Sequence, residues 1–356
     1  MNRDVFIIMN KLGGPGWGGA HRVSAIIANY LVEKGYSVNI IVWDKIQIDY
    51  PINDKVKIID LNIKQNSELA RIKACLETRK ILKKNKEAFI YILMSRIAVD
   101  VFLSTLFMKL KIIASERTDP NSEPKKKIFR IIRNQMFKYM YKTVYQTNDA
   151  KLYFPKKAQK NGIVIPNPLT PNLPKAYHGE REKVFVTYGR IDKQKNLKMM
   201  IDAFVKSHEK HENYILEIYG NGLEKENIKK YIEEKKASDY IKMYNFSKNI
   251  HEQILKKYAY LSSSDYEGMS NSMLEALAIG LPCICTDCPI GGAKMMIKDG
   301  VNGMLVPVEN SQAMTEKINE LIENKELCAK LSQNSVHIRE ELDQEKICEK
   351  WEELMK

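Results

Sequence analysis

Residues Ser263 to Pro282 read SSDYEGMSNSMLEALAIGLP, and this stretch carries more information than any other in the chain. Gly268 permits a sharp turn, and the small polar residues after it are typical N-caps of a helix. The apolar run over 273–279 then has the composition of a buried helix, which Gly280 and Pro282 end. The stretch therefore predicts a loop that opens into a short buried helix.

Two glutamates frame this predicted helix. Glu267 precedes it and Glu275 lies eight positions later, so both carboxylates lie on roughly the same side of the helix. The free backbone N–H groups of Met269, Ser270 and Asn271 and the helix dipole favour a phosphate at the N-terminus. Because a carboxylate repels a phosphate, the glutamates suit the neutral hydroxyls of a sugar and a ribose beside it. The stretch predicts a nucleotide-sugar site; the alternative is a capped surface helix with two solvated glutamates.

These residues resemble the E-x7-E signature of retaining glycosyltransferases of family 4, in the setting Glu-Gly-x6-Glu-Ala-x-Ala-x-Gly-x-Pro. The resemblance implies an α/β protein of the GT-B fold, in which two Rossmann-like domains with parallel sheets face each other across a cleft. It also implies transfer of a glycosyl group from a nucleoside-diphosphate sugar to an acceptor hydroxyl, with retention of anomeric configuration. Glu267 would then be a catalytic residue that binds hydroxyls of the donor sugar, and Glu275 would bind the ribose of the nucleotide.

Length and composition indicate a globular protein of two domains. A chain of 356 residues is longer than a domain with one hydrophobic core usually is. Its composition, 44% hydrophobic and 28% charged residues, is normal for a globular protein. We expect a first Rossmann-like domain over residues 1–170, which faces the acceptor and the membrane. The nucleotide-sugar-binding domain is expected over 171–340, after a polar, proline-bearing linker. The resemblance implies that a last helix, within 341–356, returns to the first domain.

The sequence contains no run of about 18 apolar residues, and a strand-like segment follows Met1-Asn2-Arg3-Asp4 directly. We therefore expect neither a membrane span nor a signal peptide, and a cytoplasmic protein. Six cysteines do not form a disulfide framework, so reduced thiols are expected. Cys283, Cys285 and Cys288 lie close together, but no fourth ligand has the spacing of a zinc site, which favours a structural role.

The positive charge is concentrated in the first half, where residues 1–170 contain 30 Lys and Arg against 14 Asp and Glu. Two predicted helices, at 67–86 and 124–141, are both amphipathic and basic. In the second of them the apolar arc holds Phe129, Ile132, Met136 and Tyr139, and the polar arc holds Lys126, Arg130, Arg133 and Lys138. Basic amphipathic helices suit an anionic membrane surface. The alternative is that their apolar faces pack on the sheet while their charges are solvated.

A glycine-rich loop follows the first predicted strand, Val5 to Met9, and precedes a predicted helix. Such a loop lets backbone amides approach an anion, or it is only a tight turn. Its last residues, Gly18-Gly19-Ala20-His21-Arg22-Val23, resemble the Gly-Gly element that family 4 enzymes place across from the E-x7-E helix. By this resemblance Gly18 and Gly19 belong to the acceptor and phosphate loop.

Ala114 to Pro120 read ASERTDP and end a predicted strand, where open α/β sheets place ligands. The run resembles the Ser-Glu-Arg-x-Asp-Pro segment of family 4 enzymes that build surface polysaccharides such as capsules. It implies a glycan acceptor linked to a polyprenyl diphosphate. Many relatives have a histidine here that faces the transferred sugar; this run has none, and Glu116 and Arg117 are the candidates for that contact.

Gly189 to Asn196 read GRIDKQKN, a predicted loop between a strand and a helix. Arg190 and Lys195 are cations that a diphosphate would bind, although exposed basic residues are often only solvated. The run resembles the family element Gly-Arg-x4-Lys-Asn, which implies that both hold the nucleotide diphosphate and act in catalysis. Because the two cations and the helix N-terminus take this role, neither a metal nor another cofactor is expected.

Two further strand ends resemble the base-binding loops of the family. Gly220 and Asn221 follow the predicted strand 214–219, and Tyr244 ends the strand 241–244. The expected donor is a UDP-sugar, although the sequence leaves the base and the sugar open. Together these elements predict a hexosyltransferase on the inner face of the cell membrane.

Two alternatives remain. A nucleotide-sugar epimerase of the same fold would need no acceptor, so product analysis without an acceptor separates the two. A nucleic-acid-binding protein would contact phosphates with the basic first half. Few aromatic residues lie among the basic runs, and no nucleic-acid motif is present, so we expect no nucleic-acid partner.

Overall fold

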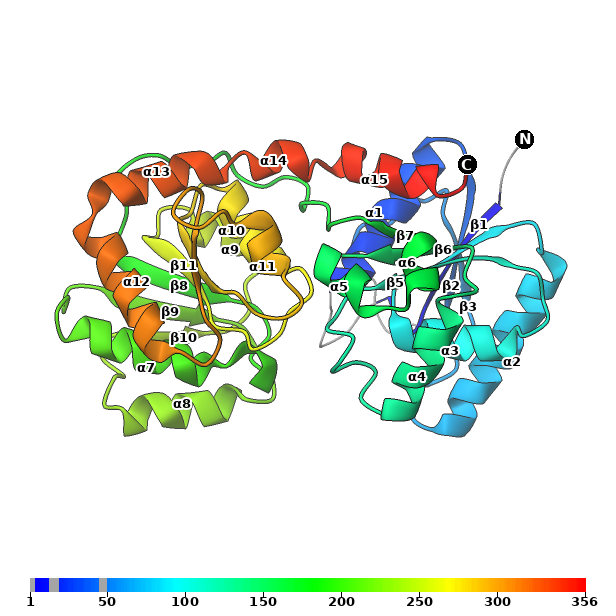
Figure 1. The fold of residues 1–356 in the computed structure, drawn as a ribbon, viewed down its shortest axis with the longest axis horizontal. Coiled ribbons are helices and arrows are strands. Elements are labelled where there is room, and N and C mark those ends of the chain that lie inside the picture. Colours follow the sequence, from blue (N-terminus) through cyan, green and yellow to red (C-terminus); the bar gives the residue numbers. More distant parts are fainter. Residues whose placement is uncertain (1–3, 13–18, 45–49) are drawn as a thin grey trace. The chain divides into compact units, whose positions relative to one another are not determined.

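The computed structural model describes residues 4–12, 19–44 and 50–356, and Figure 1 shows its ribbon. The chain divides into two compact units. The first unit runs to Pro168 and also includes Gln344–Lys356; the second unit spans Leu169–Asp343. Each unit contains one sheet whose neighbouring strands are parallel. The expected α/β class with two parallel sheets is thus confirmed.

The sheet of the first unit has seven strands in the order β3-β2-β1-β4-β5-β6-β7. The strands are β1 (Asp4–Met9), β2 (Ser37–Val42), β3 (Lys57–Asp60), β4 (Phe89–Ile92), β5 (Lys111–Glu116), β6 (Lys142–Tyr145) and β7 (Gly162–Val164). Central residues such as Ile7, Ile40 and Ile90 are completely buried, as is usual for parallel strands covered on both faces. Strand order reverses between β1 and β4, and in such sheets ligands bind at the carboxyl ends beside this reversal.

The helices of the first unit include α15, the last helix of the chain. They are α1 (Gly19–Glu33), α2 (Glu68–Lys84), α3 (Ser95–Ser104), α4 (Lys127–Met136), α5 (Asn148–Tyr153), α6 (Lys156–Lys160) and α15 (Gln344–Glu353). The side chain of Trp351 on α15 is completely buried, and the Tyr91 hydroxyl donates to its carbonyl oxygen over 2.8 Å. The last helix is therefore part of the core of the first unit.

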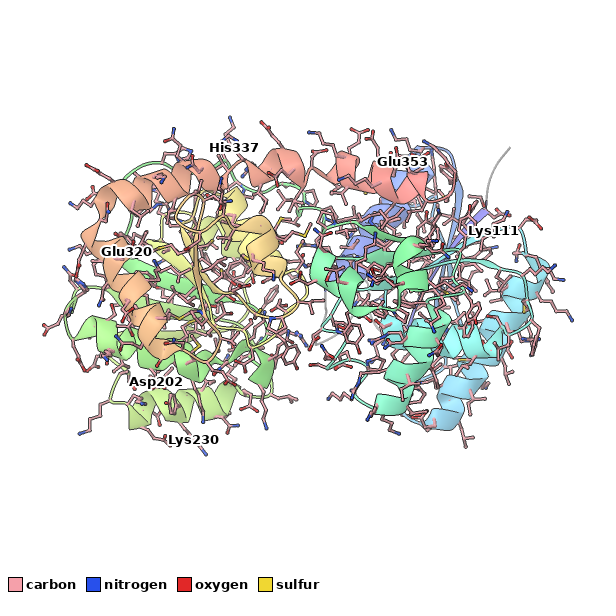
Figure 2. The ribbon with its side chains drawn as sticks, viewed as in Figure 1. Lys111, Asp202, Lys230, Glu320, His337 and Glu353 are labelled. Carbon is pink, nitrogen blue, oxygen red and sulfur yellow. The ribbon has the colours of Figure 1, made fainter. Side chains whose placement is uncertain are left out.

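The sheet of the second unit has six strands in the order β10-β9-β8-β11-β12-β13. The strands are β8 (Val184–Tyr188), β9 (Ile215–Tyr219), β10 (Ile241–Tyr244), β11 (Ala259–Ser262), β12 (Cys283–Thr286) and β13 (Met304–Val306). The helices are η1 (Lys193–Lys195), α7 (Leu197–His208), α8 (Lys225–Glu234), α9 (Ile250–Ile254), α10 (Asn271–Ala278), α11 (Gly292–Met296), α12 (Ser311–Glu323), α13 (Lys325–Ser335) and α14 (Ile338–Glu341). Phe185, Leu216 and Ile284 lie in one apolar core with residues of α7 and α12. Charged side chains such as Lys230 on α8 and Glu320 on α12 lie on the outer surface (Figure 2).

One predicted helix differs from its expected pattern. The helix expected over 124–141 is α4, which ends at Met136, so Tyr139 lies beyond it and is largely exposed. Arg133, placed on the polar arc by its spacing, is completely buried instead. The physical reason is a buried carboxylate on β5, which holds the guanidinium inside the unit.

Within the described residues, no helix combines the length and the apolar composition that crossing a membrane requires.

Candidate functional site

Two loops of the second unit are joined by hydrogen bonds at the carboxyl ends of β8 and β11. The Ser263 hydroxyl donates to the carbonyl oxygen of Lys195 over 2.8 Å. The Asn196 amide donates to Asp265 Oδ1 over 2.7 Å, and the Asp265 backbone N–H donates to the carbonyl of Gln194 over 2.9 Å. The loop that bears the predicted cations is thus fixed against the loop that leads to the predicted carboxylate.

The Lys195 ammonium forms a salt bridge with Glu267 Oε2, and the Ser264 hydroxyl donates to the same oxygen over 3.2 Å. Both charged side chains are mostly buried, so this pair is screened less by water than a surface pair. Arg190 differs, because 52% of its side chain is exposed and its only salt bridge among the described residues is to Asp192, at 3.4 Å. The structure thus brings Lys195 and Glu267 together. Arg190 lies on the same loop as Lys195, but its side chain is half exposed to solvent.

The predicted helix after Gly268 is α10. Ser270 is its N-cap, since its hydroxyl accepts from the Met273 backbone N–H, and Asn271 is the first helical residue. The loop approaches α11 so closely that a Cβ on Gly292 would lie 1.8 Å from the Gly268 carbonyl oxygen. Only glycine fits at this position, and the contact fixes the path of the chain into α10.

Glu275 lies inside the unit, with 5% of its surface exposed. His251 Nε2 on α9 lies 2.9 Å from Glu275 Oε2, and the Tyr188 hydroxyl is 3.4 Å from the same oxygen. Sequence reasoning did not identify His251 or Tyr188, because neither lies near Glu275 in the chain. Tyr188 is the last residue of β8, directly before Gly189. The contact of its hydroxyl with Glu275 therefore connects this carboxylate to the loop that bears Arg190 and Lys195.

The residues expected to surround a base lie at the carboxyl ends of β9 and β10. Gly220 has a φ of 155°, and a Cβ there would lie 1.9 Å from the carbonyl oxygen of Gly189. Its neighbour Asn221 accepts from Lys225 Nζ over 3.1 Å. The Tyr244 ring stacks on Tyr219, with centroids 4.8 Å apart, and 41% of the Tyr244 surface is exposed. An exposed aromatic face at a strand end is a surface on which a planar base can stack.

A small pocket, partly open to solvent, lies within the second unit beside these loops. Its lining includes Gly189, Arg190, Lys195, Ser263 and Ser264. It therefore combines two cations, small hydroxyls and backbone groups, which is suitable for an anion such as a diphosphate. Neither Glu267 nor Glu275 lines it.

Glu116, a candidate for contact with a sugar, is completely buried at the end of β5. Its carboxylate accepts from Arg133 Nη1 over 2.9 Å and from the hydroxyls of Ser95 and Thr118 over 2.7 and 3.0 Å. Burial raises the pKa of the Glu116 carboxyl, and the Arg133 guanidinium offsets part of this rise. The Glu116 oxygens hold α3, β5 and α4 together, and the contact of Glu116 with a transferred sugar stays a prediction.

Arg117 is the other candidate in this segment, and its side chain is also buried. It donates through Nη2 to Asn167 Oδ1. Gly19 is the first residue of α1, while Gly18 lies outside the described residues. Gly19, Glu116 and Arg117 thus belong to the first unit, whereas the donor-site candidates belong to the second unit.

Cys283, Cys285 and Cys288 are buried thiols on or after β12, and the pKa of Cys288 is raised to about 12 by burial. Over residues 4–12, 19–44 and 50–356, no three His, Cys, Asp or Glu side chains are grouped so that they would hold a metal ion.

Comparisons with known proteins show that the chain is similar to glycosyltransferases. Residues 171–337 match the family model "Glycosyl transferases group 1". An uncharacterized glycosyltransferase of Haemophilus influenzae is 25% identical over 358 residues, with 100% of both chains covered. The amylovoran biosynthesis glycosyltransferase AmsD of Erwinia amylovora is 24% identical over 352 residues, 95% of this chain and 96% of the relative.

Among solved structures, a mutant of TarM from S. aureus, in complex with Fondaparinux, alpha-GlcNAc-glycerol and UDP, is similar with a TM-score of 0.81. The likeness covers 99% of each chain at 14% identity. The chain therefore has the GT-B fold, and its residues 171–337 are similar to glycosyltransferases of group 1. These matches do not favour the epimerase alternative.

Proposed function

We propose, from the premise that the second unit is similar to glycosyltransferases of group 1, that this protein is a retaining, metal-independent hexosyltransferase of family 4. It takes a sugar from a UDP-sugar and adds it to a glycan on a polyprenyl diphosphate, during synthesis of a bacterial surface polysaccharide. The observation that carries the proposal is the pairing of Lys195 with Glu267 beside Arg190 and α10.

The pairing supports a leaving-group mechanism. As the bond between the sugar and the diphosphate breaks, negative charge grows on the diphosphate, and preorganised cations near it lower the barrier. Lys195 and Arg190 supply those cations, and the α10 N-terminus adds backbone N–H groups. Glu267 holds Lys195 in place before the donor binds and then accepts from a sugar hydroxyl. Glu275, oriented by His251 and Tyr188, accepts from the ribose.

The donor proposal rests on Tyr244 and on the comparisons. A uracil ring would stack on the partly exposed Tyr244, whose other face Tyr219 supports. The TarM complex contains UDP. The polysaccharide proposal is consistent with AmsD, named for amylovoran biosynthesis.

A peripheral membrane site is proposed on the first unit. Its apolar residues at the surface come from α2, α4, the last turn of α3 and the turn after it, and α3 packs against both of the other helices. We call this set the apolar surface; it consists of Leu69, Ile72, Leu76, Leu103, Leu106, Phe107, Ile128 and Ile131. Lys73 on α2 and Lys127 on α4 are exposed lysines of the same helices, and the exposed Lys109 lies in the loop between α3 and β5. Apolar side chains flanked by lysines bind an anionic bilayer through both burial and charge.

The experiment offers the protein UDP-, GDP- and ADP-sugars with a polyprenyl-diphosphate-linked glycan, in the presence and absence of EDTA. We expect transfer from a UDP-sugar, an unchanged rate with EDTA, and a product linkage with the anomeric configuration of the donor. An inverted linkage or a rate abolished by EDTA would overturn the mechanism. A rearranged nucleotide sugar formed without acceptor would favour the epimerase.

A further inference from the structure

Arg117 is a buried cation whose hydrogen-bonding capacity is mostly unused. It follows β5 at the carboxyl end of the strand and is 9% exposed. Its Nη2 donates to Asn167, whereas Nε and Nη1 are buried without an acceptor. No salt bridge reaches its guanidinium from any part of the chain that the structure describes. Burying a charge in this way is costly unless a partner compensates it.

The surroundings of Arg117 increase this cost. Burial is the main cause that lowers the pKa of the Arg117 guanidinium, and the nearby charge of Arg22 adds to it. Arg22 lies in the first turn of α1, which has no acidic residue. A helix N-terminus already carries positive partial charge, so a cation there is unfavourable. The charge of Arg22, in the first turn of α1, thus adds to the unfavourable surroundings of the Arg117 guanidinium.

The adjacent carboxylate does not neutralise this charge. Glu116 is the neighbour of Arg117 in sequence, but its oxygens accept from Arg133, Ser95 and Thr118. Glu116 does accept from the Arg117 backbone N–H, over 3.2 Å, which fixes the main chain and not the guanidinium. Among the residues of the first unit that the structure describes, no carboxylate thus compensates the positive charge of Arg117.

The guanidinium is held in one orientation. Asn167 Oδ1 accepts from Arg117 Nη2 and also from Gln146 Nε2, the latter over 2.6 Å. Asn167 lies between Pro166 and Pro168, which restrict its backbone to an extended conformation. Gln146 follows β6, the neighbour of β5 in the sheet. A cation oriented in advance loses less entropy when it binds a ligand.

We propose that Arg117, together with Arg22, forms a phosphate-binding site of the first unit that takes the diphosphate of the lipid-linked acceptor. A phosphate offers oxygens that accept from the parallel N–H groups of a guanidinium and cancel both charges. A donor diphosphate has the same chemistry, but its candidate cations, Arg190 and Lys195, belong to the second unit. The assignment to the acceptor rests on the proposed function, while the affinity for phosphate does not.

The test measures binding, so it is independent of turnover. The whole protein, saturated with UDP, is titrated with farnesyl diphosphate, a soluble polyprenyl diphosphate, and separately UDP is titrated alone. The variant is Arg117→Gln. The control is Lys111→Gln, which removes one positive charge from the opposite end of β5, where Lys111 pairs with Glu87. Thermal unfolding of each variant measures whether the substitution changes the stability of the protein.

We expect Arg117→Gln to weaken binding of farnesyl diphosphate at least tenfold, and Lys111→Gln to leave it within about twofold. The affinity for UDP should be the same in all three proteins. Arg117→Gln should unfold at the same temperature as the wild type or higher, because it removes an uncompensated buried charge. Loss of UDP affinity alone would overturn the assignment to the acceptor. Unchanged binding of both ligands, or a large loss of stability, would overturn the site. Absence of sugar transfer with every donor would instead refute the proposed function and leave this result intact.

Discussion

Lys195 and Glu267 form a salt bridge within the second unit, although they lie far apart in sequence and on different loops. The two charges compensate each other, and under the proposed function a bound diphosphate competes with Glu267 for the ammonium. In the proposed mechanism, the diphosphate replaces Glu267 as the partner of Lys195, and the released carboxylate becomes available to a sugar hydroxyl. Both residues of the pair are therefore expected to affect catalysis more than stability.

Replacing the two cations tests this pair. Lys195→Ala should reduce kcat more than tenfold, by about 2 to 5 kcal/mol in barrier height if the diphosphate is desolvated. Arg190→Ala should cost less, because its side chain is half exposed. In the double variant the losses should not add, since both cations serve one leaving group. Lys193→Ala, on the same loop, is the matched control for steady-state kinetics. Turnover close to the wild type in both single variants would contradict the assignment.

Glu275 and its neighbours give a second prediction, about donor affinity. Glu275→Gln keeps the shape of the side chain but removes its charge, so binding of UDP should weaken about tenfold, the loss of one charge-assisted hydrogen bond. His251→Ala should also weaken it, because the carboxylate loses the nitrogen that lies 2.9 Å from it. Titration calorimetry with UDP measures both effects, and thermal unfolding is the control. A drop in melting temperature without a change in affinity would make Glu275 a structural residue.

Much of the fold was accessible from sequence because its signals are local. The predicted strand at 5–9 corresponds to β1, and the turn at Gly268, the cap at Ser270 and the apolar run after it correspond to α10. Parallel strands alternating with helices fixed the class. Each of these signals lies within a few residues of the element that it predicts.

What sequence reasoning missed depends on contacts between distant residues. His251 and Glu275 meet only because α9 and α10 pack in one unit, and no spacing in the chain indicates this. Amphipathic spacing placed Arg133 on the polar arc of its helix, whereas a buried carboxylate on β5 determines its position. The strand β11, which leads into the loop that contains Glu267, was not predicted from the sequence.

The buried pair of Glu116 and Arg133 yields a third prediction, about stability. Arg133→Met leaves the Glu116 carboxylate buried without its cation, which should lower the free energy of unfolding by about 3 to 5 kcal/mol. The double variant Glu116→Gln with Arg133→Met should recover part of this loss, because no uncompensated charge remains. Denaturant unfolding measures the series. Equal stability of Arg133→Met and the wild type would mean that the pair is not formed in solution.

The last prediction concerns the apolar surface of the first unit. Phe107 is completely exposed, and Ile72 on α2 is about half exposed, so both are available to enter the interfacial region of a bilayer. We expect the protein to co-sediment with vesicles that contain anionic lipid, and less so at high salt, because salt screens the contribution of the lysines. Changing Phe107 and Ile72 together to serine should lower the partition coefficient at least tenfold, because even partial burial of both side chains contributes a share of the about 1.5 to 3 kcal/mol that complete burial of each one would contribute. Leu223→Ser is the matched control, because Leu223 is equally apolar and 95% exposed but belongs to the second unit. Sedimentation that is the same for the double variant and this control would contradict a membrane contact at the apolar surface.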